Sequence, residues 1–192
     1  MDPTKAPRLK PLAEKDMSEA QRKAIGELAS GPRGKVNPNG PNFALLRSPG
    51  LMEHTQKVGA YLRYGSSIPA RLNEFAILIT ARQWTAQMEW FAHSPLALEA
   101  GVSADVLAEL KQGKRPAGMK EDEAIVYDFC KGIHDNKGVV SDAAYNAVVE
   151  RFGERGVMDL IGITGYYSML AMVLNVTHVE LPDGASPPLQ PL

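Results

Sequence analysis

The sequence predicts an all-α fold, a helical bundle of about seven or eight helices. Apolar residues recur at three- and four-residue intervals in several long segments, the spacing of one face of a helix. Clusters of glycine and proline separate these segments, and no stretch of useful length alternates apolar with polar residues as a strand does. The chain has 192 residues, of which 44% are hydrophobic, enough to bury one core. We therefore expect one domain over residues 1–192.

The N-terminal part predicts an arm, a helix and a loop. Residues 1–16 carry three prolines among mixed charges, which indicates an arm rather than a core element. Ser18 and Gln21 have the spacing of a capping box, so a helix should begin there and run to about Ala29. Proline and glycine are so dense over 31–41 that this segment should be a substantial loop.

Two longer helices are predicted in the middle of the chain. A short apolar turn over 43–46 precedes a Ser-Pro pair, which favours the start of a helix over 48–64. A second helix should begin at Pro69, because apolar residues then recur at helical spacing through Phe91. Pro95 should break or redirect that helix, since proline removes a backbone donor.

The C-terminal half predicts further helices and an extended tail. Serine caps and glycine-containing turns divide it into segments with apolar faces. The expected helices cover 104–111, 121–133, 141–152 and 154–176. The last of these is largely apolar and should be the central core helix. The proline-rich segment 182–192 should be an extended tail.

Composition excludes several classes of protein. The formal net charge is -1, so no overall field favours nucleic acid or an anionic membrane. We expect no membrane span, because no apolar run approaches about 20 residues, and the N-terminus lacks the apolar core of a signal peptide. The single cysteine, Cys130, leaves no disulfide framework within one chain. These features fit a cytoplasmic protein, and we expect Cys130 to be a buried, inert thiol.

Six residues of the helix predicted from Pro69 lie within roughly 100° of one another on a helical wheel. They are Glu74, Leu78, Arg82, Thr85, Glu89 and His93. The rest of this helix is apolar, which favours an internal cleft for the charged groups. A carboxylate beside a histidine in a cleft is a usable acid/base pair near neutral pH. The alternative is a set of ordinary ion pairs along one helix.

The remaining candidates are weaker. His54 is interpreted as a surface or partly packed residue, and His134 as a surface residue or a favourable contact with a helix dipole; the role of His178 stays open. No metal site is expected, because Glu89 and His93 provide two ligands without a further cluster. Trp84 and Phe43 suit a flat or apolar substrate, although such residues are also ordinary core packing.

Three segments together resemble the carboxymuconolactone decarboxylase family, which includes the alkylhydroperoxidase D-like proteins. The first contains Glu74, Arg82-Gln83-Trp84, Glu89-Trp90 and His93; the others are 40–49 and 165–175. The resemblance covers about residues 38 to 184. It implies an all-α fold, assembly as homotrimers or homohexamers, and active sites in clefts near subunit contacts.

The peroxidase branch of that family has a Cys-Xaa-Xaa-Cys pair between its glutamate and its histidine. Here Ala86 and Glu89 stand at the two cysteine positions, while Glu74 and His93 match the flanking residues. Thiol peroxidase chemistry needs a thiolate nucleophile and a resolving thiol, so it is not expected. The presence of Glu89 in place of the second cysteine points to the decarboxylase-like branch of the family.

The resemblance therefore implies a cofactor-independent carbon–carbon lyase acting on a small carboxylated lactone of aromatic catabolism. His93 is the expected proton donor, Glu89 orients it or acts as the acid itself, and Glu74 holds Arg82. Arg82 is expected to bind the substrate carboxylate in a bidentate fork, beside Trp84 and Phe43. Alternatives are an isomerase, hydrolase or hydratase on a related carbonyl compound, a peroxidase-family member by homology only, and a non-catalytic ligand-binding oligomer.

Overall fold

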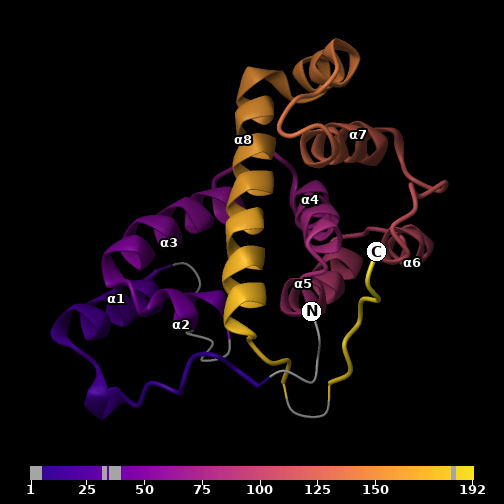
Figure 1. Ribbon diagram of the computed structural model, residues 1–192. Coiled ribbons are helices and arrows are strands. Elements are labelled where there is room, and N and C mark those ends of the chain that lie inside the picture. Colours follow the sequence, from indigo (N-terminus) through magenta and orange to yellow (C-terminus); the bar gives the residue numbers. More distant parts are fainter. Residues whose placement is uncertain (1–5, 32–33, 35–39, 183–184) are drawn as a thin grey trace.

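The computed structural model describes residues 6–31, 34, 40–182 and 185–192. Every regular element in this part of the chain is helical, as the sequence predicted (Figure 1). A 3-10 turn at Glu14–Asp16 precedes eight α-helices. These are α1 (Glu19–Ser30), α2 (Pro41–Leu45), α3 (Pro49–Tyr64), α4 (Ala70–Gln83), α5 (Gln87–Glu99), α6 (Ala104–Lys111), α7 (Glu121–Asp135) and α8 (Asp142–Thr177).

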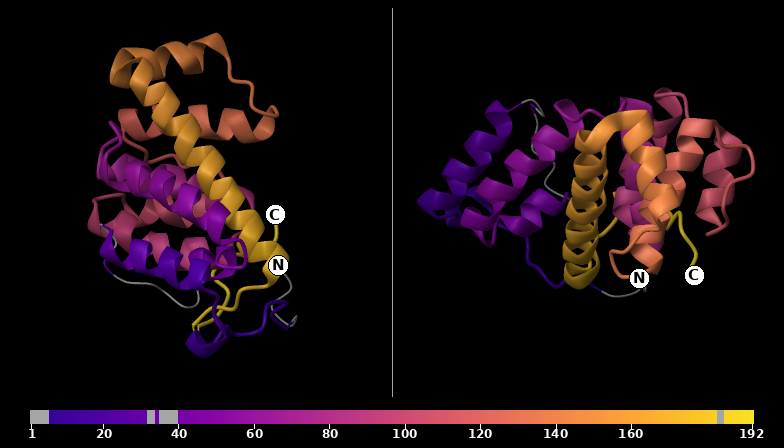
Figure 2. Two further views of the ribbon diagram at one scale, coloured as in Figure 1. Left: turned by 90° about the vertical axis from the view of Figure 1, so that its left-hand side faces the viewer. Right: turned by 90° about the horizontal axis from the view of Figure 1, so that it is seen from above.

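Helix α8 stands at the centre of the molecule. Helices α1, α2 and α3 lie on one side of it and α4 to α7 on the other (Figures 1 and 2). It packs against α2, α3, α4 and α7, so its apolar composition follows from burial on several sides. Gly153 has a φ of 70°, which breaks the helix where the sequence predicted two helices to meet. A residue with a Cβ rarely adopts this φ.

Helix α8 bears on the expectation that no segment of the chain spans a membrane. It is long and apolar enough to cross a membrane by length and composition, and 56% of its most apolar window is buried within the protein. The core helix of a soluble protein has this same property, because a helix that packs on most sides is apolar nearly all round.

The predicted single helix from Pro69 to Phe91 is wrong, because the chain turns back within it. Helix α4 ends at Gln83 and α5 begins at Gln87, and the two pack against each other as a hairpin. Thr85, in the connection, has a φ of 47°, a left-handed conformation that ends α4. The sequence gives little warning, since threonine is not a usual residue at such a position.

The predicted break at Pro95 is also wrong. Pro95 lies inside α5, which continues to Glu99. Proline removes one backbone donor without ending a helix whose next turn is anchored in the core. Ala97 provides that anchor, because it is fully buried two residues later.

Two polar clusters, each built around a buried carboxylate, fix the start of α4. Arg71 pairs with Asp122, at 2.6 Å, and with Glu123, which joins α4 to the start of α7. Asp159 of α8 accepts hydrogen bonds from the backbone and the hydroxyl of Ser67, at 2.7 and 2.8 Å, and so closes the α3–α4 connection. Helix α4 is therefore held at its N-terminal end against α7 and α8.

The N-terminal arm and the C-terminal tail both lie against this frame. The backbone N–H of Arg8 donates to the carbonyl of Thr177 at the end of α8. In the tail, Leu189 is buried against the start of α5. The predicted loop over 31–41 lies mostly outside the described residues.

Candidate functional site

Glu74 and His93 meet across the α4–α5 hairpin. The Nδ1 atom of His93 lies 2.6 Å from Oε2 of Glu74, in hydrogen-bonding contact. Both residues are less than 10% exposed. The prediction that one helical face aligns them is wrong, since they belong to two helices. They come together because α5 folds back along α4.

Glu89 faces the other nitrogen of His93. It precedes His93 by four residues on α5, and its Oε2 lies 3.3 Å from Nε2. Its second oxygen, Oε1, is buried and makes no hydrogen bond within the described part of the chain. His93 therefore has a carboxylate at each ring nitrogen, and one of these carboxylates keeps an acceptor for another molecule.

Arg63 is the basic partner of Glu74, and no pattern in the sequence indicated this contact. Its Nη2 lies 3.5 Å from Oε1 of Glu74, and its guanidinium stacks over the ring of Tyr64. Arg63 belongs to the last turn of α3, so no spacing within one helix relates it to Glu74. The prediction that Glu74 holds Arg82 is wrong, because Arg63 takes that place.

Tyr167 of α8 forms one wall of this cluster. Its ring meets that of His93 edge to face, with 5.2 Å between ring centroids, and Tyr166 meets Tyr167 in the same way at 5.3 Å. Both tyrosines lie in the segment 165–175 that resembles the family, which was the available signal. These aromatic walls lower the local polarity and strengthen the interaction between His93 and its carboxylates.

The surroundings of His93 favour its protonated form. Burial lowers the pKa of the imidazole, but hydrogen bonds and charge interactions with Glu74 and Glu89 outweigh this, so the pKa lies above its usual value. An imidazolium between two carboxylates, with Arg63 beside them, leaves the four charges balanced. Such a group can give a proton to a substrate and recover it from a carboxylate.

Arg82 lies apart from Glu74 on the same helix. Eight residues separate the two, which is about 12 Å along the axis of α4. Arg82 is only 3% exposed, yet neither Nε nor Nη1 has a hydrogen-bond partner among the described residues. Burial lowers the pKa of the guanidinium. A buried guanidinium with two donors unmatched among the described residues indicates a place for an anion.

Arg82 and Glu89 occupy the same end of the hairpin. Arg82 is in the last turn of α4 and Glu89 in the first turn of α5. They form no ion pair with each other, so unpartnered donors and an unpartnered acceptor coexist there. The donors of Arg82 suit an anion, and the free oxygen of Glu89 suits a hydroxyl or another donor.

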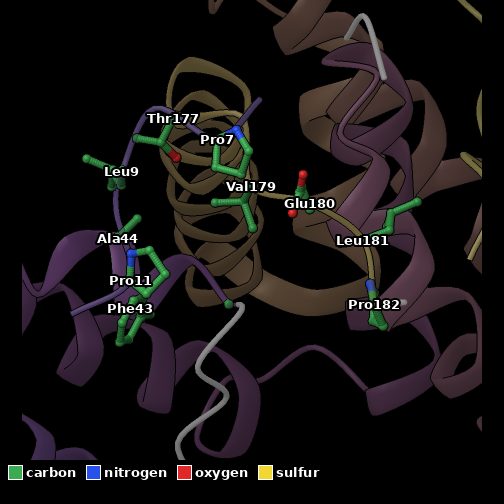
Figure 3. Close-up of a pocket in the computed structure, with 11 residues that line it drawn as sticks. Pro7, Leu9, Pro11, Phe43, Ala44, Thr177, Val179, Glu180, Leu181 and Pro182 are labelled. Atoms are coloured by element: carbon green, nitrogen blue, oxygen red, sulfur yellow. The ribbon is translucent and has the colours of Figure 1, made fainter. Parts of the chain in front are cut away.

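Trp84 and Phe43, the two aromatic candidates for substrate binding, lie in different parts of the molecule. Trp84 lies in the α4–α5 connection, is 38% exposed, and donates from Nε1 to Ser168 Oγ at 3.0 Å. Phe43 of α2 lines a cavity of about 540 Å³ between the N-terminal arm and the segment that follows α8 (Figure 3). Neither Glu74 nor His93 lines this cavity, so the structure does not group Phe43 with the acid/base residues.

The other histidines and Cys130 lie elsewhere. His54 is exposed on α3, as expected. His134 is half-buried rather than on the surface, because its Nε2 contacts Thr80 Oγ1 at 3.2 Å. His178 ends α8 in a left-handed conformation and contacts the carbonyl of Ala6 at 3.2 Å. Cys130 is fully buried, which raises the pKa of its thiol to about 12 and confirms an inert residue.

No group of three or more histidine, cysteine, aspartate or glutamate side chains in the described part of the chain is arranged to hold a metal ion. No protein-family model and no curated protein matches the chain.

Proposed function

We propose that the protein is a cofactor-independent acid/base enzyme acting on a small carboxylated ring compound, with decarboxylation of a lactone as its reaction. The observation that carries the proposal is the buried imidazole of His93 between the carboxyl groups of Glu74 and Glu89. Burial of the whole cluster makes each of its electrostatic interactions stronger than in water.

The proposed reaction uses His93 as general acid. The bond between the carboxylate carbon and the ring breaks, CO2 leaves, and the electron pair enters the conjugated carbonyl system as an enolate. His93 Nε2 then gives its proton to carbon, and solvent restores that proton through Glu89. Glu74 is a positioning residue, because its hydrogen bond to Nδ1 fixes the ring and leaves Nε2 as the working nitrogen.

Arg82 supplies the charge for substrate binding in this proposal. Its unpartnered guanidinium nitrogens suit a carboxylate, and it lies at the same end of the hairpin as Glu89. Trp84 lies at that same end and offers an aromatic surface to the ring. Phe43 lines a cavity to which neither Arg82 nor His93 contributes, so it is left outside the proposed mechanism.

The proposal includes self-assembly as a homotrimer or homohexamer in the cytoplasm. Helix α8 presents an exposed apolar stripe on the side that other helices leave uncovered, which suits a second copy of the chain. The stripe consists of Met158, Ile161, Met172 and Val176, each at least 43% exposed.

The test is CO2 release from a panel of carboxylated lactones, with thiol-dependent peroxide consumption as a parallel assay. His93→Gln should lower kcat by at least about 100-fold, the usual contribution of a general acid, while the circular dichroism spectrum is retained. His54→Gln is the matched control, because His54 is exposed on another helix. Full activity of His93→Gln would overturn the assignment. A product isomerised or hydrated without CO2 release would assign the related acid/base reaction instead.

A further inference from the structure

Arg82 presents an energetic problem in the ligand-free protein. Its guanidinium is almost fully buried, and two of its three nitrogens have no acceptor among the described residues. Removing a cation from water without giving it a counter-ion costs free energy. An anion beside Arg82 would therefore stabilise this arrangement.

Leu192, at the end of the C-terminal tail, lies near this group and is itself 71% exposed. A Cβ built on Gly113 would lie 3.9 Å from Arg82 Nε and would collide with Leu192 Cδ2. The side chains of Arg82 and Leu192 therefore both border Gly113, which lies in the turn after α6. The tail runs past α5 toward α6 to reach this place (Figure 1).

One side chain of α5 anchors the tail. The Gln87 amide donates from Nε2 to the carbonyl of Leu189 and accepts from the backbone N–H of Leu189 at Oε1, both at 2.8 Å. Leu189 itself is 2% exposed. The neighbouring tail residues Gln190 and Pro191 are exposed, so the tail is held mainly at this one point.

We propose that the segment 185–192 is a lid that closes over a small organic carboxylate bound to Arg82. Closure of the lid and binding of the anion favour each other. Closure removes water from Arg82, and the anion supplies the negative charge that Arg82 would otherwise lack in the closed state. The inference rests on the anion-binding role given to Arg82 under the proposed function, and it adds that the tail and the ligand bind cooperatively.

The first test follows exchange of the Leu189 amide hydrogen by nuclear magnetic resonance, with benzoate as the probe. Benzoate should slow this exchange by about tenfold, within the range usual for coupled sites. Benzamide has the same shape without the charge and should have no effect. An equal effect of benzamide, or no effect of benzoate, would overturn the proposal.

Two variants test the coupling from each side. Leu189→Ala should weaken benzoate binding by about the same factor, because coupling is reciprocal; Gln190→Ala is the control, since its side chain is exposed. Arg82→Met should remove the response to benzoate and slow Leu189 exchange in the ligand-free protein, because no unpaired charge remains under the lid. Faster or unchanged exchange in Arg82→Met would contradict the proposal.

These measurements are independent of turnover. If the lactone assays fail while benzoate and the lid remain coupled, the proposed reaction is wrong and the lid stands. If turnover is found while benzoate leaves the exchange rate of the Leu189 amide unchanged, the lid proposal is wrong and the proposed reaction is retained.

Discussion

Replacing Glu74 with glutamine removes one of the two negative charges that hold His93 protonated. The amide oxygen of glutamine can still accept the hydrogen bond from Nδ1, so the shape of the cluster is retained. What changes is the charge next to the imidazolium and next to Arg63, which lies 3.5 Å away. The variant therefore isolates the electrostatic part of the Glu74–His93 contact.

The expected loss of stability follows from the geometry. The contact between Glu74 Oε2 and His93 Nδ1 is 2.6 Å long, and both side chains are about nine-tenths buried. A hydrogen bond between charged groups of this kind contributes about 1.5–3 kcal/mol. We expect Glu74→Gln to lower the free energy of unfolding by about 2 kcal/mol near pH 6, or the melting temperature by roughly 4–8 °C for a chain of this size.

The loss should depend on pH in a defined direction. The pKa of His93 is raised in the folded protein, so its stabilising effect is complete below the unfolded-state pKa of about 6.5 and is lost as pH rises through the folded-state pKa. The hydrogen bond to Glu74 is one of the causes of that raised pKa. In Glu74→Gln the pKa of His93 should fall, and the difference in stability from the parent protein should narrow as pH rises.

Urea unfolding measured from about pH 6 upward checks the expected loss of stability and its dependence on pH. Nuclear magnetic resonance titration of His93 checks the expected fall in its pKa. Glu99→Gln is the control, because Glu99 is an exposed residue on the same helix. A His93 pKa that does not move, or a stability difference that stays constant with pH, would refute the electrostatic account of this cluster.

Three further outcomes are expected. Asp159→Asn should lower the free energy of unfolding at neutral pH by about 1–3 kcal/mol. Burial raises the pKa of Asp159, but hydrogen bonds from Ser67 and Tyr61 outweigh burial and hold this pKa below its usual value. The parent protein therefore loses this stability as pH falls through that pKa, and in urea unfolding the variant should lose less stability on acidification. Thr85→Gly should raise the unfolding free energy by about 1 kcal/mol, because Thr85 has a φ of 47°; a lower value would contradict strain there. Cys130 should react with a thiol reagent at pH 8 only after denaturation, since its pKa is about 12, and rapid labelling of the native protein would show that it is accessible.

Much of the helical framework was predictable because its signals are local. The capping box at Ser18 and Gln21 is present in the structure, and Ser103 and Ser141 accept backbone hydrogen bonds at the starts of α6 and α8. Each such signal acts within three residues of a helix end, so the amino-acid order suffices to find it. The break at Gly153 was predictable for the same reason.

The break at Thr85 was not predictable in this way. Threonine is β-branched and disfavours a left-handed φ, so its local preference opposes the observed turn. Packing of α5 along α4 outweighs that preference, because it buries residues on both helices. The error mattered for the site, since one long helix would have kept Glu74 far from His93.

The sequence by itself determined the helical class, most helix ends, and the identity of Glu74, Glu89 and His93 as unusual polar groups in an apolar segment. Only the tertiary structure decided which groups meet. It paired Glu74 with Arg63, left Nε and Nη1 of Arg82 without a hydrogen-bond partner among the described residues, and brought Leu189 to Gln87, 102 residues away along the chain. Helix signals act over one turn, whereas contacts of charged groups depend on how whole helices pack, and no spacing in the sequence records that packing.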